Sequence, residues 1–519
     1  MPTSARRTRM ALIAVAAAVA ASVVVAAPAH AADITVTSSA DAGAGSLRAA
    51  LAGAASGDRI VFDPSVTSIV LESALAVTVG VHIDGPGAGL LTISRVAASN
   101  FNEIQLVGAV GEDYVLEGLT LDGTGSQAPA IYADLNTDDV TLRDVVVSNQ
   151  TSIIGGAALY TFQTDGDFLF EDCLFQANTN TGLGAGAEGG AIKLDGVGGD
   201  VTFRNTSFVS NTSAQSAGAA WIGGVAGDLV IEDSTFSGNV ATEGPGGALR
   251  VESLDGAASI TRSSFLDNEA GTDFTFGGAV FGQFPELTVQ SSTFAGNSLP
   301  GGGIGISIGG GVPGPALIQN STFDETGDDE FALYFSGVDS GQVPPTLDIL
   351  NSTIVGPAGL YVETNEGDVT VENTIIQATN GRAVATDTGA AIHVSWSILS
   401  SPLDSDIADD GNNRFSTDAL LGALADNGGP TLTRLPNATS PAINGGDPAV
   451  VGAPEFDQRG DGFPRILQGR LDVGAVETAA LASTGATLAW PLPVAGGLLL
   501  LAGIGAVVLA HGTRRARAF

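Results

Sequence analysis

The stretch FLFEDCLFQAN (Phe168–Asn178) decides the fold, because close copies of it recur along the chain. Each copy is a short alternating run, then a hydrophobic anchor, two further residues and an asparagine. Alternating runs rich in Val, Ile, Thr and Phe are typical of β-strands, so the chain contains an array of short, repeated strands. The other clear copies are VTFRNTSFVSN (Val201–Asn211), LVIEDSTFSGN (Leu229–Asn239), SITRSSFLDN (Ser259–Asn268) and LTVQSSTFAGN (Leu287–Asn297).

The anchor residue can be followed well beyond these five copies, with successive anchors 22 to 33 residues apart. A repeat of this length, built from short strands and tight turns, fits one coil of a parallel β-helix, in which stacked coils bury a core that no single coil can bury. An array of immunoglobulin-like sandwiches is the alternative, but it needs about 100 residues per domain. The anchors are Leu121, Val147, Phe175, Phe208, Phe236, Phe265, Phe294, Phe323, Ile354, Ile376 and Ile398.

A second short strand in each repeat follows paired glycines. Examples are GGAIKL (Gly189–Leu194), GGALRV (Gly246–Val251) and GGAVFG (Gly277–Gly282). No helical pattern of useful length separates the strands, which argues against βαβ units. The predicted fold class is therefore all-β: a right-handed, pectate-lyase-like parallel β-helix solenoid over residues 65–402.

Stacking the coils predicts two ladders of side chains about 4.8 Å apart. Four residues before the anchor stand Glu117, Arg143, Glu171, Arg204 and Glu232, whose charges alternate in sign and should form an exposed ion-pair ladder. The asparagines after the anchors should form a buried structural ladder, since Asn tolerates a left-handed turn and its amide can bond the coils on both sides. They are Asn178, Asn211, Asn239, Asn268 and Asn297.

The composition limits the partners of the chain. It has 20 basic and 56 acidic residues, a net charge of −36. Such a surface repels nucleic acid, so no nucleic-acid partner is expected. Cys173 is the single cysteine and Lys193 the single lysine, so no intramolecular disulfide can form. A large core and backbone hydrogen bonds must stabilise the fold instead.

The beginning of the chain predicts export. Residues 1–31 have a basic start, an Ala/Val-rich run and small residues at Ala29 and Ala31, the pattern of a secretory signal peptide with its cleavage site. Residues 32–64 are expected to form an N-terminal cap and the first strand. Ser46 is a suitable N-cap for a short helix, and an open β-helix needs such covers because its end exposes strand edges.

The order of motifs along the chain resembles a known class of protein. SLRAAL…GDRIVF, β-helix coils and a turn-rich segment containing DNGGPT, SPAIN, DQRG and DVGAVE resemble bacterial surface proteins of the choice-of-anchor Q class. The GGA[ILV] and FxxN motifs resemble the repeats of polymorphic outer-membrane proteins. The resemblance implies an exported β-helix joined to an envelope anchor, and it carries over no catalytic residues. Residues 403–478 are expected to wrap the last coil as a C-terminal cap.

Residues 479–519 are similar to a sortase sorting signal of high-GC Gram-positive bacteria. An apolar run over residues 486–510 is long enough to span a bilayer, and Arg514, Arg515 and Arg517 would hold the tail in the cytoplasm. The resemblance implies that sortase joins Thr484 to peptidoglycan and so places the exported protein in the cell wall; a retained transmembrane anchor is the alternative. The motif LASTG consists of Leu481, Ala482, Ser483, Thr484 and Gly485.

Catalysis on the coils is a further hypothesis. A polysaccharide lyase needs carboxylates that bind Ca²⁺ beside a basic residue that removes a proton. Glu232, Asp233 and Arg262 lie on adjacent predicted coils and are candidates, although the ion-pair ladder explains the same residues. No cofactor other than Ca²⁺ is expected. Loose Ca²⁺ binding has further candidates, in a spacing that fits no EF-hand loop: Asp406, Asp409 and Asp410.

Two functions follow from these patterns. The favoured one is a non-catalytic, wall-anchored surface protein whose β-helix contacts a polysaccharide or a host or neighbouring cell, as an adhesin does, because the coils show no convergent acid, base and nucleophile. The alternative is a Ca²⁺-dependent polysaccharide lyase or a related carbohydrate-active enzyme. The shape of any groove depends on the loops Gly182–Glu188, Thr212–Gly218 and Gly301–Pro315.

Overall fold

The structure is a computed structural model that describes residues 31–478, with gaps. Ala29, the LASTG motif and the apolar run 486–510 lie outside the described residues. Among the described residues, no helix has the length and hydropathy of a membrane span. The gaps are residues 109–110, 124, 126, 134–136, 185, 272–276, 300–304, 310–313, 326–330, 338–344, 365–366, 387–389, 451–452 and 468.

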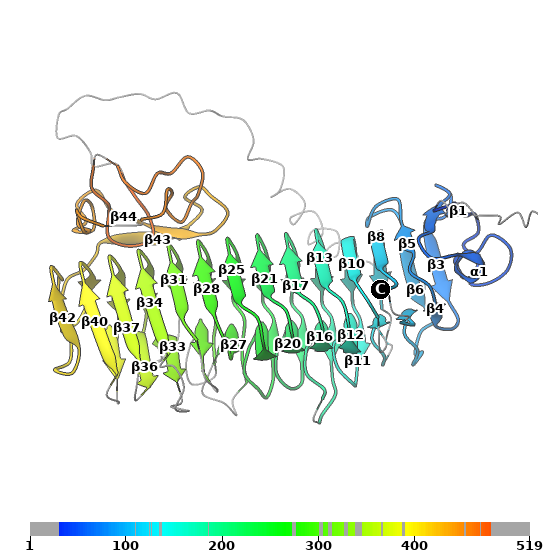
Figure 1. The fold of residues 1–519 in the computed structure, drawn as a ribbon, viewed down its shortest axis with the longest axis horizontal. Helices are drawn as coiled ribbons and strands as arrows, with labels where there is room; N and C mark the ends of the chain where they lie inside the picture. Colours follow the sequence, from blue (N-terminus) through cyan, green and yellow to red (C-terminus); the bar gives the residue numbers. More distant parts are fainter. Residues whose placement is uncertain are drawn as a thin grey trace, which may run out of the picture. The chain divides into compact units, whose positions relative to one another are not determined.

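The predicted parallel β-helix is confirmed. Figure 1 shows one coil after another stacked in chain order, and each strand pairs in parallel with the matching strand of the next coil. The largest sheet carries two strands from most coils. Its strands are β1 (Asp33–Val36), β2 (Arg59–Phe62), β3 (Ser68–Leu71), β5 (His82–Asp84), β6 (Thr92–Arg95), β8 (Tyr114–Asp122), β10 (Val140–Ser148), β13 (Phe168–Glu171), β14 (Leu174–Gln176), β17 (Val201–Arg204), β18 (Ser207–Val209), β21 (Leu229–Glu232), β22 (Thr235–Ser237), β25 (Ala258–Thr261), β26 (Ser264–Leu266), β28 (Leu287–Gln290), β29 (Thr293–Ala295), β31 (Ala316–Gln319), β32 (Thr322–Asp324), β34 (Thr346–Leu350), β35 (Thr353–Gly356), β37 (Asp368–Glu372), β38 (Ile375–Ala378), β40 (Ala391–Ser395), β41 (Ile398–Leu399) and β42 (Ala408–Gly411).

The strands that follow the paired glycines belong to a second sheet, which we call the 12-stranded sheet after its strands in the described residues. They are β4 (Leu75–Val77), β7 (Ile104–Leu106), β9 (Ile131–Ala133), β12 (Leu159–Thr164), β16 (Ile192–Val197), β20 (Ala220–Val225), β24 (Leu249–Leu254), β27 (Val280–Gly282), β30 (Ile306–Ile308), β33 (Phe331–Gly337), β36 (Ala358–Thr364) and β39 (Val384–Thr386). Short strands between the two sheets are β11 (Thr151–Ser152), β15 (Thr179–Asn180), β19 (Thr212–Ser213) and β23 (Val240–Ala241).

The N-terminal end of the coils is covered by the predicted helix, α1 (Leu47–Gly53). Ser46 is its N-cap and accepts a hydrogen bond from the backbone N–H of Ala49. Leu47 and Leu51 are buried against the first coil. A short helix that buries an apolar stripe can therefore close the core at the end where the strands begin.

Each coil from β17 to β29 turns sharply at two residues with left-handed backbone, and a buried polar residue follows each turn. In the coil of β21 and β22 these residues are Asp233 (φ 51°) and Gly238 (φ 61°), followed by Ser234 and Asn239. A sharp turn removes backbone N–H groups from the regular strand ladder, and a buried N–H must find another acceptor. The buried side chain from the next coil supplies it.

After the second turn, that acceptor is asparagine. The Oδ1 atom of Asn211 accepts hydrogen bonds from both the backbone N–H and the Nδ2 of Asn178, each at 3.0 Å. Its own Nδ2 donates to Asn239 Oδ1 at 2.9 Å. The same pattern continues to Asn268 and Asn297. Each amide thus bonds the coils on both sides and fixes their register.

After the first turn, the acceptor is a hydroxyl group. The backbone N–H of Ser234 donates to Ser263 Oγ at 3.1 Å, and that of Ser263 donates to Ser292 Oγ at 3.1 Å. This second buried ladder was not predicted from the sequence. Its members are Thr206, Ser234, Ser263, Ser292, Ser321, Ser352, Thr374 and Ser397.

The anchor residues stack in the core beside these ladders. The rings of Phe236 and Phe265 are parallel within 3° with centroids 4.7 Å apart, and the stack continues to Phe323. The predicted alignment holds up to Ile376, but the next anchor is Leu399 rather than Ile398. The hydroxyl ladder explains the shift, because Thr374 bonds to Ser397 and so fixes the register there.

The asparagine ladder ends at each side in buried ionisable groups. At its C-terminal end the carboxyl group of Glu325 replaces an asparagine and accepts from the backbone N–H of Asn297 at 2.8 Å and from its Nδ2 at 3.0 Å. At the other end Asn178 accepts from the backbone N–H of Gln150. Gln150 in turn contacts the buried pair Arg95 and Glu103.

We expected the segment after the last coil to wrap that coil as a cap. Instead, it packs beside the earlier coils. It begins with the antiparallel hairpin β43 (Leu421–Ala425) and β44 (Thr433–Pro436), drawn beside the coils in Figure 1. Arg434 forms a bidentate ion pair with Asp324: its Nε lies 3.0 Å from Oδ2 and its Nη2 lies 2.9 Å from Oδ1. Gln458 donates to Thr293 at 2.9 Å. Backbone and side-chain contacts to earlier coils therefore hold this segment.

The acidic end of the asparagine ladder predicts a pH-dependent stability. Burial raises the pKa of Glu325 to about 8, against 4.5 for an exposed glutamate. Because the folded state holds this proton more tightly, its stabilising effect is fully present below about pH 4.5. The effect is lost as the pH rises to about 8, at about 1.4 kcal/mol per pH unit. Glu325→Gln should remove this dependence, measured by urea unfolding at several pH values. Equal pH slopes for the two proteins would contradict the assignment.

Candidate functional site

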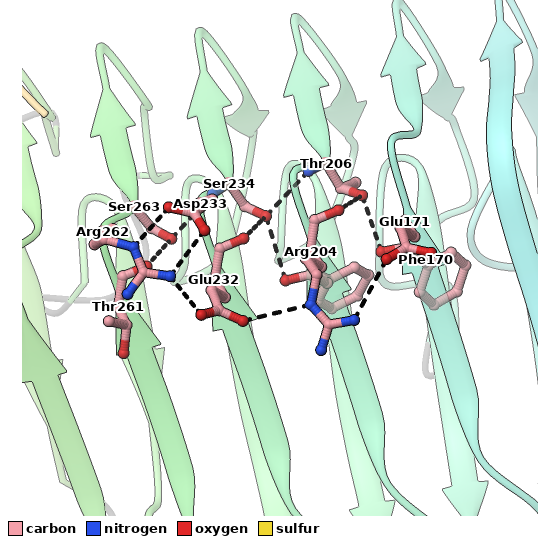
Figure 2. Close-up of polar contacts among 11 residues, drawn as sticks. Phe170, Glu171, Arg204, Thr206, Glu232, Asp233, Ser234, Thr261, Arg262 and Ser263 are labelled. Atoms are coloured by element: carbon pink, nitrogen blue, oxygen red, sulfur yellow. Dashed lines mark hydrogen bonds and ion pairs between the residues drawn. The ribbon is translucent and has the colours of Figure 1, made fainter. Parts of the chain in front are cut away.

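The ion-pair ladder predicted from the sequence is confirmed on the outside of the largest sheet. Arg143 Nε lies 2.8 Å from Glu171, and Arg204 bridges Glu171 and Glu232 at 3.4 Å each. Figure 2 shows the part of this line from Glu171 through Arg204 to Glu232, across neighbouring strands. The hydrogen bond from Arg143 lowers the pKa of Glu171. These groups are substantially exposed, so each pair contributes about 0–1 kcal/mol and mainly supports register.

The three residues considered for lyase chemistry form the end of this ladder. Arg262 contacts Glu232 and makes two bonds of 2.8 Å to Asp233 (Figure 2). Its hydrogen bonds with Asp233 and Glu232 raise the pKa of Arg262 above its ordinary value. A guanidinium held in this way stays protonated and cannot remove a proton from a substrate. The arrangement closes the ladder and offers no general base.

The three aspartates considered for Ca²⁺ do not converge. Asp409 accepts from the backbone N–H of Gly411 at 3.0 Å and from Asn413 Nδ2 at 2.7 Å, whereas Asp410 pairs with His393. Asp406 is bonded to Ser405. Within the described residues, they form no cluster of three carboxylates at ligand distance.

A different group of residues gathers on the outer face of the 12-stranded sheet. Strand register aligns one residue from each of the successive strands in a single row, and in the GGAIK, GGALR and GGAVF copies this is the residue after the apolar one. Lys193 lies between Tyr160 and Trp221, and Trp221 lies between Lys193 and Arg250. The row is Tyr132, Tyr160, Lys193, Trp221, Arg250, Phe281, Ser307, Tyr334 and Tyr361.

Lys193 is the centre of this row and is only 2% exposed. Its Nζ donates to the backbone carbonyl of Gly186 at 2.7 Å and to Glu188 at 2.8 Å, and it lies 3.8 Å from Asp195. The same ammonium lies 4.7 Å from the ring centroid of Trp221. An ammonium between carboxylates and an aromatic face gains both ion-pair and cation–π energy, which offsets its desolvation.

The two carboxylates beside Lys193 respond differently to burial. Burial alone would raise the pKa of Glu188, but the hydrogen bond and charge of Lys193 lower it below the ordinary value. Burial raises the pKa of Asp195, only partly opposed by the charge of Lys193. Burial and then the charge of Asp195 raise the pKa of Tyr160. Lys193 therefore holds Glu188 closely, at 2.8 Å, and Asp195 less closely, at 3.8 Å.

The side chain of Asn180 holds the chain segment that carries Glu188 and leads to Lys193. Asn180 Nδ2 donates to the carbonyl of Ala187 at 2.8 Å, and its Oδ1 accepts from the backbone N–H of Gly182 at 3.0 Å. On the next strand, the indole of Trp221 lies across Gly223, where an added Cβ would come within 2.2 Å of the ring. Only glycine leaves room for this indole, whose N–H has no partner in the described structure.

Exposed apolar side chains occur in the same coils as this group. Nine large apolar side chains are exposed in the part of the chain that the structure describes, and four of them lie between residues 153 and 183: Ile153, Ile154, Phe162 and Leu183. Phe162 is 41% exposed and stands beside Asp195 in the sheet. We call Ile153, Ile154, Tyr160, Phe162, Leu183, Lys193, Asp195 and Trp221 the Lys193 face.

The sequence contained a signal for this face that we did not use. The residue after the apolar residue of the GGA motif is Lys193, Arg250 or Phe281, and Tyr160 and Trp221 occupy the same position after the related stretches GGAAL and AGAA. The loop Gly182–Glu188 was expected to shape a groove, and it lies next to this row. The structure added the register that brings these residues together.

Comparisons with known proteins find similarity to solved structures in fold only. No protein-family model matches the chain, and no curated protein matches it. The A-module of mannuronan C-5 epimerase AlgE6 from Azotobacter vinelandii is 12% identical, over 67% of this chain and 94% of that one, with a TM-score of 0.35. The AlgE4 A-module from the same organism is 14% identical, over 70% and 96%, with a TM-score of 0.31. The catalytic domain of the D1045A variant of a GH87 α-1,3-glucanase in complex with nigerose is 11% identical, over 73% and 69%, with a TM-score of 0.35. We transfer no residue role from them.

The burial of Lys193 predicts a large effect of its removal. Lys193→Met leaves Glu188 half-buried without its partner, which should lower the free energy of unfolding by about 3 kcal/mol. Adding Glu188→Gln should restore part of the loss. Arg204→Met, on the exposed ladder, serves as the matched control and should cost less than about 1 kcal/mol. Denaturant unfolding measures all three. If the free energy of unfolding fell by the same small amount in Lys193→Met and Arg204→Met, Lys193 would not be a stabilising partner of Glu188.

Proposed function

We propose that this chain is a wall-anchored surface protein that binds a neutral polysaccharide through the Lys193 face. The attachment rests on the sequence pattern alone: the LASTG motif, the apolar run 486–510 and the basic tail follow one another in the order that a sortase substrate requires. Sortase and peptidoglycan are then the partners that fix the protein, through Thr484, at the cell surface.

The observation that carries the binding proposal is the composition of the Lys193 face. Phe162 and Tyr160 offer aromatic surface on which the C–H faces of a sugar ring can pack, and the carboxylate of Asp195 stands directly beside them. Asp195 can accept hydrogen bonds from sugar hydroxyls. Binding sites commonly combine apolar and aromatic walls with a few fixed polar groups, as this face does.

The charges of the face favour a neutral glycan. Lys193 is paired with Glu188, and Arg250 with Glu252. Neither cation is therefore free to bind a carboxylate or sulfate of a polysaccharide. The whole chain has a net charge of −36, which repels a polyanion. A hydroxyl-rich, uncharged ligand meets neither obstacle.

Binding fits the structure better than cleavage does. Glu188 is engaged by Lys193, and Glu232 and Asp233 by Arg262, so Asp195 is the carboxylate of the face that is left for a ligand. The usual glycosidase mechanism requires a pair of carboxyl groups at the scissile bond, and Asp195 supplies one. Cleavage by a Ca²⁺-dependent lyase is therefore an alternative outcome of the test and not part of the proposal.

The test is retention of the full-length protein on immobilised polysaccharides. We expect retention on a neutral glucan, none on alginate or polygalacturonate, and no new unsaturated or reducing ends with or without Ca²⁺. Phe162→Ala and Tyr160→Ala should each weaken retention at least about fivefold, the loss expected for an aromatic contact of about 1 kcal/mol.

Arg204→Ala, on the ladder, is the control and should bind as the unchanged protein does. Retention that survives both aromatic substitutions would show that the ligand binds elsewhere. Retention only on acidic polysaccharides would contradict the neutral-ligand proposal. Release of new chain ends in the presence of Ca²⁺ would establish the lyase alternative instead.

A further inference from the structure

The ion-pair ladder contains one break in its alternation of charge, at its N-terminal end. Strand register places Asp84 directly beside Glu117, and Glu117 beside Arg143. From Glu117 onward the charges alternate, but Asp84 and Glu117 are two carboxylates in adjacent positions. Like charges directly opposite each other in a sheet are destabilising. This position is therefore suited to a cation between the two strands.

An imidazole completes this site. His82 lies on β5 with Asp84, and its Nε2 lies 2.9 Å from Glu117 Oε2 on β8. One ligand atom from each of His82, Asp84 and Glu117 lies within 4.8 Å of the others. The three side chains are 32%, 16% and 30% exposed, so they are partly buried but reachable from solvent.

The neighbouring arginines do not fill the site. Arg143 lies 3.5 Å from Glu117 but 2.8 Å from Glu171, so its stronger contact is directed away from the site. Arg59 contacts Asp84 and is 45% exposed. A surface contact of this kind is worth little and can give way to a metal ion. Arg59 should lower the affinity of the site without preventing binding.

We propose that His82, Asp84 and Glu117 bind a divalent transition-metal ion, with Zn²⁺ as the representative ion. An imidazole nitrogen with two carboxylate oxygens suits Zn²⁺, whereas Ca²⁺ takes six or more oxygen ligands. A tetrahedral zinc ion at about 2.0 Å from each ligand needs ligand atoms about 3.3 Å apart. His82 Nε2 and Glu117 Oε2 already lie 2.9 Å apart, and a carboxylate oxygen of Asp84 lies within 4.8 Å of them. The ion would join the coils of β5 and β8.

The test uses the full-length protein purified without a histidine tag and titrated with Zn²⁺ alone in a calorimeter. We expect one equivalent to bind and the Tm of the protein to rise, because the folded state alone holds the three ligands together. His82→Asn and Glu117→Gln should each weaken binding by more than about tenfold. His393→Asn is the matched control, since His393 also pairs with a single carboxylate, and it should bind as the unchanged protein does.

Circular dichroism without metal checks that the two ligand variants are folded. Should either fail to fold, Co²⁺ added to the unchanged protein gives an independent reading, because tetrahedral Co²⁺ absorbs visible light and octahedral aqueous Co²⁺ absorbs weakly. No binding by the unchanged protein would overturn the proposal. Equal binding by His82→Asn and the unchanged protein would also overturn it, since the ion would then lie at another site. Loss of binding in His393→Asn alone would do the same.

Discussion

The structure depends on the need to satisfy the backbone N–H groups at the two sharp turns of each central coil, from β17 to β29. Each turn uses a left-handed residue, such as Asp233 or Gly238, and so takes one N–H out of the strand ladder. The next coil supplies the missing acceptor from a buried side chain, a hydroxyl after the first turn and an asparagine amide after the second. Because each acceptor belongs to a neighbouring coil, a coil cannot shift along the strands without leaving buried donors unpaired.

A fixed register makes the outer surface predictable in space, so side chains far apart in sequence form continuous rows. On the largest sheet this gives the alternating charges from Glu117 onward, and on the 12-stranded sheet it gives the Lys193 face. The two surfaces differ in what they expose. The charges of the ladder are paired with one another, whereas the Lys193 face presents exposed Phe162 beside Asp195. The coils therefore act as a rigid support, and the ligand would be recognised by side chains on one sheet.

The fold and the ion-pair ladder could be predicted from the sequence because both depend on one repeat spacing. The hydroxyl ladder escaped prediction, since Ser and Thr are common throughout the chain and do not stand out. Lys193 was noticed as the single lysine, but its burial depends on the conformation of a loop. The spacing of residues in the sequence does not determine that conformation. The C-terminal segment lies beside the coils because residues such as Arg434 find partners there, and a pair 110 residues apart in sequence gives no local pattern.

Native-state hydrogen exchange of the Asn211 backbone amide tests the central claim most directly. This N–H donates to Asn239 Oδ1 at 3.0 Å, across the boundary between two coils. In Asn239→Ala the donor stays buried without an acceptor, at a cost of about 1–3 kcal/mol. The account predicts that exchange at Asn211 accelerates by about 5- to 150-fold in the variant, and not in Ser237→Ala. Unchanged exchange at Asn211 would contradict the claim that side chains from the next coil fix the register.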